Sequence, residues 1–419
     1  MLKTISIEEK LRNAVGLENL RDAGDRATVC GVQSRFVAEP EDELQLASLL
    51  AAANEAGIAV VPRGGGTKLD WGNPPERAEA ILSTTKLNRI LEHAWADLTV
   101  TVEAGCTLQI LQTALAQHGQ RLACDCLWPT LATVGGALST NDSGALRLRF
   151  GALRDLVIGV TLALPDGTLA SSGGKVVKNV AGYDLPKLAT GALGTLGVIT
   201  RAVFRLHPLP SSAKSFSFTS NNLETMQRHL LSIQNSRLAH TALQIRCGSD
   251  APSHGDILFE ATEAGIRAQE SQLRNLLGST SLEGCSETVW DAREQLWTSA
   301  DHSTILKISV LPAEMAKTLM ALEKISISQN LRWQMVMQAT GLGMVRVEGA
   351  PGQLSVMIEK LRAEAEHSGG SLVILRRPKE LGSLDAWGTA GDAGSLMRAV
   401  KQQLDPKRIL NPGRYVAGI

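Results

Sequence analysis

The sequence lacks an excess of either charge, because 42 lysine and arginine residues balance 42 aspartate and glutamate residues. This balance argues against a protein whose main partner is a nucleic acid or another polyanion, although it allows local charged patches. The N-terminus has no apolar core of signal-peptide length, and no apolar run approaches the roughly 20 residues that cross a bilayer. We therefore expect a cytoplasmic protein, either free or attached peripherally at the inner face of the membrane.

The sequence also has few cysteines, and they form no metal-binding pattern. Six are scattered along the chain, and the pair Cys124 and Cys126 has neither a second pair nor the neighbouring histidines that a zinc site requires. A ferredoxin-type run of four cysteines is absent. We expect reduced, partly buried thiols and no metal, so any iron–sulfur chemistry would have to come from another chain.

With 419 residues, of which 44% are hydrophobic, the chain is long enough for two or three domains with full cores. Glycine clusters are frequent before residue 210 and rare after residue 212, where helix-like and strand-like segments alternate. We expect a helical lead-in over 1–29, a first domain over 30–210, a second domain over 211–380 and a C-terminal segment over 381–419. The pattern favours the α+β class.

Hydrophobic periodicity and turn residues indicate the main elements. In the first part we expect helices from Glu43 to Gly57 and from Leu108 to Leu115, and strands over 58–61, 80–83, 98–103, 157–164 and 200–206. After residue 212 we expect helices over 221–234, 263–277, 313–329 and 352–366, strands near 241–246, 304–310, 334–338, 343–348 and 371–376, and a last helix from Gly394 to Leu404.

One glycine-rich loop carries the clearest sign of a binding site. The run over 58–61 is typical of a buried strand, and the three glycines at 64–66 then let the backbone approach a ligand closely. Their N–H groups can converge on a phosphate, with Arg63, Thr67 and Lys68 at the rim.

No helix is expected after this loop, because the segment over 70–75 contains a glycine and two prolines. The loop therefore differs from the dinucleotide-binding fingerprint, in which the glycines open a helix. Three glycines also occur in simple flexible turns, and composition alone leaves this alternative open.

A second stretch, residues 129–144, consists mostly of small or short polar residues from residue 132 onwards. This composition suits a backbone that lies against a ligand, with N–H and hydroxyl donors directed at an anion. A tight packing contact between two elements has the same composition and remains the alternative.

Together the loops form a more specific pattern than any of them alone. In chain order they are Pro-x-Gly-x-Gly-Thr at 62–67, Thr-Val-Gly-Gly at 133–136 with Asn141 and Gly144, Arg-Asp-Leu-Val at 154–157, Leu-Pro-Asp-Gly at 164–167, Lys-Asn-Val-Ala-Gly-Tyr-Asp-Leu at 178–185, Gly-Thr-Leu-Gly-Val-Ile at 194–199 and Leu-Asn-Pro-Gly-Arg at 410–414. This series resembles the FAD-binding domain of the vanillyl-alcohol oxidase and p-cresol methylhydroxylase superfamily. Within it, the chain is most similar to the smaller FAD-binding subunits of bacterial glycolate oxidases.

The resemblance implies two α+β subdomains with FAD between them, an α+β cap domain, and a C-terminal segment that returns to the FAD-binding domain. By the same resemblance the loop at 62–68 holds the pyrophosphate, Ile199 lies near the adenine, and Asn411 and Arg414 are brought close to the FAD-binding domain. The cofactor-binding residues that it implies are Pro62, Arg63, Gly64, Gly65, Gly66, Thr67, Lys68, Thr85, Leu87, Gly105, Pro129, Thr133, Val134, Gly135, Gly136, Ser139, Asn141, Gly144, Ile199 and Asn411. Covalent members often have a histidine after the loop glycines, where this chain has Thr67 and Lys68, so non-covalent FAD is expected.

The chain departs from the superfamily where catalysis is concerned. The 2-hydroxy acid dehydrogenases of the superfamily carry a motif in the cap domain that consists of His, Gly-Asp-Gly-Asn and a second His. This motif binds a metal and abstracts the substrate proton. Here no two of the eight histidines are close in sequence, Asp-Gly-Asn is absent, and Leu193 stands where an acidic residue often precedes Gly-Thr-Leu-Gly. No catalytic residue can therefore be assigned.

The resemblance thus implies an FAD-binding subunit of a glycolate oxidase complex, which oxidises glycolate to glyoxylate together with a sister FAD-binding catalytic subunit and an iron–sulfur subunit. Two alternatives stay open. In the first alternative, the chain is an autonomous FAD-dependent oxidoreductase for a 2-hydroxy acid such as D-lactate. In the second, it is a structural subunit with a vestigial flavin.

A few further side chains allow more than one interpretation. Arg147, Arg149 and Arg154 are candidates for a substrate carboxylate, although solvated arginines or FAD-phosphate ligands are the simpler interpretation. Tyr183 is either close to the flavin or packed with a satisfied hydroxyl group. His207 is most simply a surface residue, and core or interface anchors are the favoured interpretation of Trp290, Trp297, Trp333 and Trp387.

Overall fold

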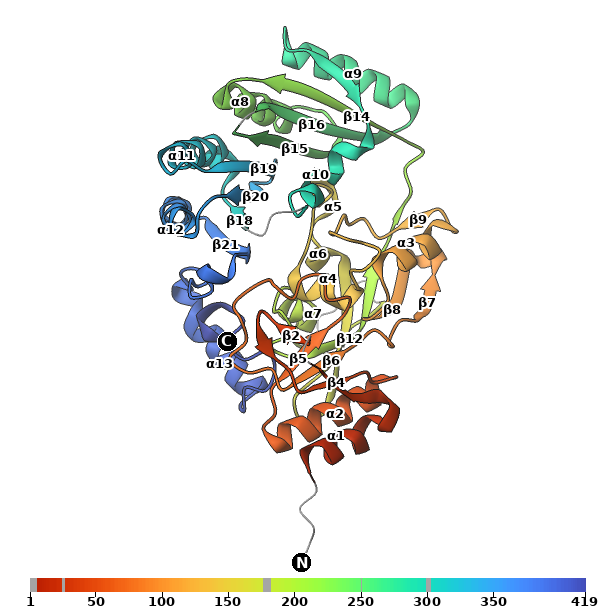
Figure 1. Ribbon diagram of the computed structural model, residues 1–419. Coiled ribbons are helices and arrows are strands. Elements are labelled where there is room, and N and C mark those ends of the chain that lie inside the picture. The colour runs from red at the N-terminus through yellow and green to blue at the C-terminus, as the bar shows by residue number, and fades with distance from the viewer. Residues whose placement is uncertain (1–5, 25–26, 176–181, 250, 299–302) are drawn as a thin grey trace, which may run out of the picture. The chain divides into compact units, whose positions relative to one another are not determined.

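The computed structural model describes residues 6–24, 27–175, 182–249, 251–298 and 303–419 (Figure 1). These residues form two compact units. The first contains the chain up to Ser143, Gly151–Leu209 and Thr389–Ile419, and the second contains Gly144–Phe150 and Pro210–Gly388. Both units combine helices with sheets, so the expected α+β class is confirmed.

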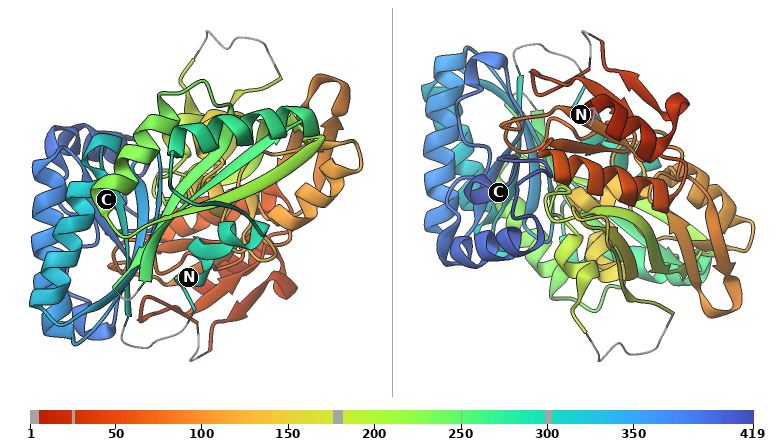
Figure 2. Two further views of the ribbon diagram at one scale, coloured as in Figure 1. Left: turned by 90° about the horizontal axis from the view of Figure 1, so that it is seen from above. Right: turned by 90° about the horizontal axis from the view of Figure 1, so that it is seen from below.

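The first unit contains a four-stranded sheet in the order β1-β4-β6-β5. The strands are β1 (Leu20–Asp22), β4 (Phe36–Ala38), β6 (Ala80–Ser83) and β5 (Val60–Arg63), and β6 pairs in parallel with β4 and β5. The helices α1 (Ile7–Val15) and α2 (Glu43–Ala56) lie side by side and bury Leu11, Leu46 and Leu50 in the core shared with this sheet (Figures 1 and 2).

Local sequence explains the limits of α2. The Asp42 carboxylate accepts hydrogen bonds from the backbone N–H groups of Leu44 and Gln45, which satisfies two free donors of the first turn. Gly57 ends the helix in the left-handed conformation, with φ of 68°. Both limits agree with the sequence-based expectation.

A five-stranded antiparallel sheet forms the second layer of this unit, in the order β11-β10-β12-β8-β7. Its strands are β7 (Ile90–Ala94), β8 (Thr99–Glu103), β10 (Val157–Ala163), β11 (Leu169–Gly173) and β12 (Val198–Arg205), and its helices are α3 (Leu108–Ala116), α4 (Val134–Thr140), α6 (Leu153–Leu156) and α7 (Leu185–Ala189). Two short ribbons, β2 (Thr28–Val29) with β3 (Val32–Gln33) and β9 (Gln120–Arg121) with β13 (His207–Pro208), complete the unit.

The C-terminal segment contains α13 (Gly394–Leu404) and returns to the first unit, as expected. Leu410 forms a parallel bridge with Val60 at the edge of the four-stranded sheet. The ammonium group of Lys401 donates hydrogen bonds to the carbonyl oxygens of Thr195 and Leu410, at 2.7 and 2.9 Å, and to the carboxylate of Asp405 at 2.6 Å. All three donors of this buried lysine are therefore satisfied within the unit.

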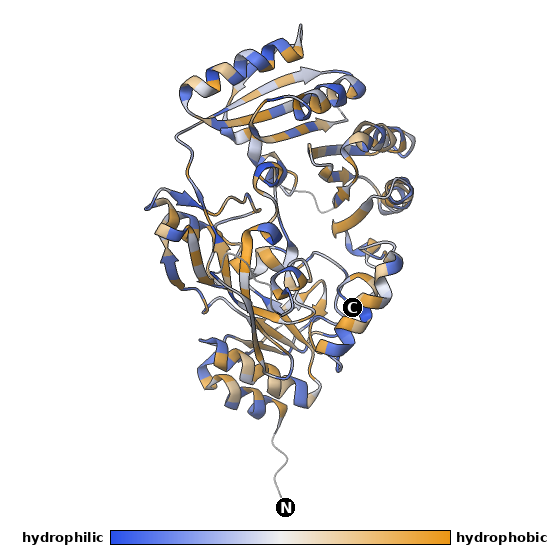
Figure 3. Ribbon diagram, turned by 180° about the vertical axis from the view of Figure 1, so that it is seen from behind, coloured by the Kyte–Doolittle hydropathy of each residue, from blue (hydrophilic) through white to orange (hydrophobic). Residues whose placement is uncertain are grey.

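The second unit is built on an eight-stranded antiparallel sheet in the order β17-β14-β16-β15-β19-β20-β18-β21. Its strands are β14 (Ser212–Ser220), β15 (His240–Gly248), β16 (Ala251–Ala261), β17 (Leu282–Cys285), β18 (Ser303–Ser309), β19 (Arg332–Gln338), β20 (Leu342–Glu348) and β21 (Ser371–Arg376). Four long helices, α8 (Leu223–Gln234), α9 (Glu263–Leu277), α11 (Met315–Ser328) and α12 (Pro351–His367), carry apolar and polar residues in alternation (Figure 3).

The apolar sides of these helices form one core with one face of the sheet, which contains Phe216, Phe259, Met337 and Leu361. The opposite face is partly covered by α5 (Arg147–Phe150) and by the short helix α10 (Ala292–Gln295). Residues Ala145, Ala242 and Leu258 make a small separate apolar cluster there.

Two sequence-based expectations need correction. The helical lead-in over 1–29 is helical only in α1 and a 3-10 turn at Leu17–Asn19, and the rest of its described part enters β1 and β2. In the second unit, the helices and five strands expected there are found, but β14, β16 and β17 were not expected. Phe and Ser alternate in the middle of β14, at 215–218, and β16 begins with Ala, Pro, Ser, His and Gly, so neither strand contains a long run of β-branched residues.

None of the helices in the described ranges has the length and apolar character needed to cross a membrane. Within the same ranges, no group of three or more His, Cys, Asp and Glu side chains is arranged to hold a metal ion.

Candidate functional site: a glycine loop with free amides

The loop after β5 has the open backbone that the sequence predicts. No helix follows it, and Gly66 has a φ of 75°, in the region that favours glycine. Within the described part of the chain, none of the backbone N–H groups of residues 64–67 donates to a protein acceptor. Four successive free amides form a set of donors suited to a phosphate group.

Two of the glycines are also required for packing. A Cβ atom on Gly64 would lie 2.0 Å from the hydroxyl oxygen of Thr133, and one on Gly65 would lie 1.8 Å from the carbonyl oxygen of Leu131. The loop therefore presses against the turn that precedes α4. The tight packing contact between two elements, which was the alternative interpretation of the small-residue stretch, is thus found here, and contact with a ligand stays a prediction.

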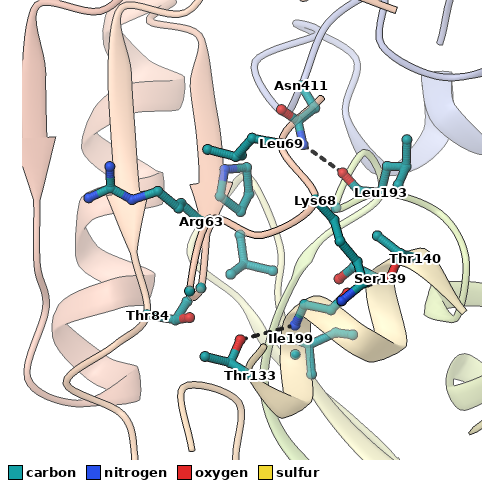
Figure 4. A pocket seen from close by; sticks show the side chains of 18 of the residues that line it. Arg63, Lys68, Leu69, Thr84, Thr133, Ser139, Thr140, Leu193, Ile199 and Asn411 are labelled. Carbon is teal, nitrogen blue, oxygen red and sulfur yellow. Dashed lines mark hydrogen bonds between the residues drawn. The ribbon is translucent and has the colours of Figure 1, made fainter. Parts of the chain in front are cut away.

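The helix α4 forms the facing wall of the pocket. Its N-cap residue Thr133 accepts a hydrogen bond of 3.3 Å from the Gly136 N–H group. A Cβ atom on Gly136 would meet only the Thr133 hydroxyl within 4 Å, at 3.2 Å, so apart from this one close contact there is room beside the glycine. Ser139 and Thr140 line the pocket from the next turn (Figure 4).

The structure brings together most of the predicted cofactor-binding residues around one pocket (Figure 4). The predicted residues that line it are Pro62, Arg63, Gly64, Gly65, Gly66, Thr67, Lys68, Thr133, Gly135, Gly136, Ser139, Ile199 and Asn411. Seven others do not line it, namely Thr85, Leu87, Gly105, Pro129, Val134, Asn141 and Gly144. Of these, Leu87 belongs to the core under α2, Thr85 is exposed, and Gly144 belongs to the second unit.

Lys68 differs from the expected cation at the rim of the loop. It is buried, and its ammonium group lies 3.3 Å from a carboxylate oxygen of Asp142, which is also buried. The same group lies 3.3 Å from the Leu127 carbonyl oxygen and over the rings of Trp71 and Trp128. Lys68 is therefore bound by the protein, and no local feature of the sequence indicates Asp142 as its partner.

Arg63 is half-buried and forms no hydrogen bond or ion pair with a described residue. Burial, followed by repulsion from Arg21, lowers the pKa of its guanidinium group. The side chain points away from the Lys68 side of the loop (Figure 4). Arg63 lines the pocket but is not one of the residues, 64–67, whose free backbone amides form the donor set.

Two residues of the C-terminal segment close the pocket. The Asn411 amide nitrogen donates to the Leu193 carbonyl at 2.6 Å (Figure 4), while its buried amide oxygen has no hydrogen-bond partner among the residues that the structure describes. The Arg414 guanidinium donates to the carbonyl oxygens of Leu69 and Trp71, the latter at 2.9 Å. The free amides, the room beside Gly136 and the unpaired Asn411 oxygen fit a phosphate-bearing cofactor such as FAD.

Sequence reasoning assigned no role to several residues that line the pocket. They are Leu69, Thr84, Leu193, Gly194, Gly197 and Val198, whereas Thr140 belongs to the stretch at 129–144 that was expected to face a ligand. A signal for three of them was present in the Gly-Thr-Leu-Gly-Val-Ile motif at 194–199. Leu193 has a positive φ of 51°, and its N–H group donates to the Ser139 carbonyl, which fixes this motif against α4.

The other candidates lie elsewhere. Tyr183 is 87% exposed, so the expectation of a packed tyrosine is wrong. Residues 178–181 of the motif that precedes it lie outside the described residues. Arg154 belongs to the first unit, whereas Arg147 and Arg149 belong to the second, and none of the three lines the pocket.

The tryptophans and His207 have structural roles. Trp333 is buried in the core of the second unit, and Trp387 packs against it. The indole N–H groups of Trp290 and Trp297 donate to Ser215 and Met344. His207 lies on the two-residue strand β13, where burial lowers the pKa of its imidazole.

Comparison with known protein families gives two matches. A family model described as "FAD binding domain" matches residues 34–173, and one described as "FAD linked oxidases, C-terminal domain" matches residues 389–415. Apart from Gly144–Phe150, the two segments belong to the first unit, and they supply most of the pocket walls.

Three similar proteins illustrate the range of relatives. The glycolate oxidase subunit GlcD of Bacillus subtilis is 29% identical over 58% of this chain and 53% of its own length. A D-lactate dehydrogenase of Archaeoglobus fulgidus is 39% identical over 41% of this chain and 38% of its own length. A D-2-hydroxyglutarate dehydrogenase of Xanthomonas citri pv. viticola is 27% identical over 90% of this chain and 88% of its own length. The chain thus spans about half of the first relative and less of the second.

Solved structures show the same fold at low identity. A p-cresol methylhydroxylase with bound substrate matches with a TM-score of 0.79 and 16% identity over 99% of this chain and 96% of that protein. An alkyldihydroxyacetonephosphate synthase matches with a TM-score of 0.74 and 16% identity over 98% of this chain and 86% of that protein. The expected fold, a p-cresol methylhydroxylase-type FAD-binding domain with a second α+β domain, is confirmed.

Proposed function

We propose that this chain, which contains an FAD-binding domain and has the p-cresol methylhydroxylase-type fold, serves in the oxidation of a small 2-hydroxy acid as a subunit of a glycolate oxidase complex. Its cofactor is FAD. The relatives named glycolate oxidase subunit, D-lactate dehydrogenase and D-2-hydroxyglutarate dehydrogenase support a 2-hydroxy acid as the substrate class. Glycolate, which would be oxidised to glyoxylate, is the specific substrate that we propose.

The observation that carries the FAD site is the run of four free amides at 64–67. In our proposal these amides bind the pyrophosphate, Gly136 gives it room, and Asn411 and Arg414 hold the surrounding loops in place. Bound FAD supplies a two-electron acceptor for a CH–OH group. No His, Cys or Tyr is among the described residues that line the pocket, which supports non-covalent binding there.

The proposed complex has two partners, a sister FAD-binding catalytic subunit and an iron–sulfur subunit. Its support is the sequence itself, which contains every FAD-binding loop of the superfamily but not the cap motif with two histidines and Asp-Gly-Asn. A base beside a Lewis acid is the usual means of removing the proton of a 2-hydroxy acid. A sister subunit would supply this pair, and the iron–sulfur subunit would receive the electrons.

One observation favours a second candidate. The D-2-hydroxyglutarate dehydrogenase relative aligns over 90% of this chain, and its name contains no subunit term. An autonomous FAD-dependent 2-hydroxy acid oxidoreductase is therefore the alternative. The free amides of the loop speak against a structural subunit with a vestigial flavin, since such a subunit has no need to keep them.

The visible absorption spectrum of the purified chain, recorded before and after anaerobic addition of glycolate, separates these candidates. We expect an oxidised flavin spectrum that bleaches only after the sister and iron–sulfur subunits are added. Bleaching of the single chain by glycolate or D-lactate would instead establish the autonomous enzyme. A chain purified without flavin that also fails to take up added FAD would overturn the FAD-site proposal.

A further inference from the structure

The second unit contains a separate pocket between the open face of its sheet and α10. Strands β15, β16, β19 and β20 form one wall, and Gln295 and Leu296 contribute from the other side. The lining residues used below are Arg246, His254, Arg332, Gln334, Arg346 and Glu348. Among the described lining residues there are thus three guanidinium groups and one carboxylate.

A buried carboxylate fixes the most central of these arginines. Asp256 is fully buried and accepts hydrogen bonds from Arg246, whose Nε and Nη2 atoms lie 2.6 and 2.9 Å from its two oxygens. Gln244 donates to the same carboxylate at 3.0 Å, and the Ser217 hydroxyl donates as well. This bidentate pairing fixes the plane of the guanidinium group.

The remaining nitrogen of Arg246, Nη1, has no partner within the described part of the chain. The side chain is 29% exposed, whereas Asp256 beneath it is fully buried. A buried ion pair contributes little net stability, because desolvation of both charges offsets their attraction. Keeping this pair therefore serves a purpose other than stability, and orienting Arg246 towards the pocket is the purpose that the geometry offers.

The sheet register places further polar groups around Arg246. His254 on β16 lies directly opposite it, and Gln334 on β19 pairs with Arg346 on β20 in the adjacent part of the sheet. Arg346 is held by Glu348 and by the carbonyl oxygen of Thr298, at 2.5 and 2.7 Å. The pocket thus presents guanidinium, amide and imidazole groups around a volume lined also by Trp333 and Val336.

We infer that this pocket binds a small oxyanion, a carboxylate or a phosphate, with Arg246 as the main contact and Asp256 as its positioning residue. Guanidinium groups cannot bind a metal cation, and a fixed, planar fork matches the two oxygens of a carboxylate or phosphate. The inference goes beyond the proposed oxidation, since it requires nothing of the flavin.

Isothermal titration calorimetry on the FAD-loaded full chain tests this inference, with sodium glycolate and sodium phosphate as separate probes and sodium chloride as the ionic-strength control. We expect one of the two probes to bind, and the better binder identifies the anion class. Arg246→Gln should weaken binding at least about tenfold, as expected for a lost charge-assisted hydrogen bond. Arg246→Lys should weaken it by a smaller factor, because the charge stays and the fork is lost.

Two further variants keep the test decisive if Arg246→Gln fails to fold. Gln295→Trp fills the pocket from α10 without touching the Arg246–Asp256 pair, and it should abolish binding. Arg228→Gln, a matched control on α8 outside the pocket, should bind like the wild type. Absence of binding by either probe, or wild-type binding by both Arg246→Gln and Gln295→Trp, would overturn the inference. Flavin reduction is read in the same samples, so loss of oxidation is distinguished from loss of anion binding.

Discussion

The side-chain amide of Asn411 donates a 2.6 Å hydrogen bond to the backbone carbonyl of Leu193, which joins two residues 218 positions apart at the wall of the cofactor pocket. Both residues are buried, and Leu193 is in turn fixed to Ser139 of α4. One hydrogen bond thus connects the C-terminal segment, the Gly-Thr-Leu-Gly motif and the facing helix.

Replacing Asn411 with alanine should weaken FAD binding. The change leaves the Leu193 carbonyl oxygen buried without this donor, at a cost of about 1–3 kcal/mol, and about 1.4 kcal/mol corresponds to a tenfold change in the dissociation constant. Titration of the apoprotein with FAD, followed by flavin fluorescence, measures the change. Asn275→Ala, on the exposed side of α9, is the control and should bind FAD like the wild type.

Adding one methyl group at Gly136 or at Gly65 should have different consequences. Gly136 lies in a helix, where alanine is more favourable by about 1 kcal/mol, and its Cβ atom would meet only the Thr133 hydroxyl group, at 3.2 Å, which a small shift of that side chain can relieve. Gly136→Ala should therefore keep or raise the stability of the apoprotein but lower its FAD content. Gly65→Ala should lower both, since its Cβ atom would overlap the Leu131 carbonyl oxygen.

The ratio of flavin absorbance to protein absorbance and the urea midpoint of the apoprotein measure the two effects. Full FAD content in Gly136→Ala would mean that α4 does not face the cofactor. Wild-type stability in Gly65→Ala would contradict the tight contact between the loop and the turn before α4.

Lys401→Met should destabilise the first unit strongly. The substitution leaves the fully buried Asp405 carboxylate without its cation and removes hydrogen bonds to the Thr195 and Leu410 carbonyl oxygens. Breaking one side of a buried ion pair costs about 3–5 kcal/mol. Urea denaturation measures the loss, and Lys360→Met on the exposed side of α12 should change the free energy of unfolding by less than about 0.5 kcal/mol.

The free energy of unfolding should fall as the pH is lowered below about 6.5, the pKa of histidine in an unfolded chain. Burial is the main cause that lowers the pKa of His207, His229 and His240 in the folded protein. Below pH 6.5 the unfolded chain therefore binds more protons than the folded one. The contribution of these neutral, buried histidines to the free energy of unfolding is fully present above pH 6.5. It is lost as the pH falls through their pKa values in the folded protein.

Urea midpoints at pH 7.5, 6.5 and 5.5 measure this dependence. His240→Gln removes the most buried of the three groups, so the midpoint of the variant should fall less steeply with acidification than that of the wild type. Equal slopes for the two proteins would show that His240 titrates alike in the folded and unfolded chains.

The cofactor loops could be predicted from the sequence because glycine marks each close approach of the backbone. The helices α2 and α13 were predictable for a related reason, since their periodic apolar residues and the breakers at their ends are local features. Strands β14 and β16 were not predictable, because polar residues interrupt their apolar residues: Ser215 and Ser217 in β14, and His254 and Asp256 in β16. The β-propensity of the local sequence does not indicate a strand of this kind.

The distant partners of the charged residues could not be predicted. Lys68 is paired with Asp142, and Lys401 donates to the Thr195 carbonyl at a separation of 206 positions. Only the assembled fold brings these segments together, whereas the ion pair of Lys401 with Asp405, four positions later, is a local feature. From the sequence, Lys68 was expected to be a phosphate-binding cation at the rim of the loop.

The bridge between Val60 and Leu410 also has a consequence for biosynthesis. The glycine loop leaves the ribosome early, whereas Asn411 and Arg414, which hold the walls of its pocket, are translated some 350 residues later. A nascent chain therefore exposes the free amides without the residues that enclose them. Stable capture of FAD must follow synthesis of the segment up to Arg414, and a ribosome stalled within the second unit would carry a chain unable to retain its cofactor.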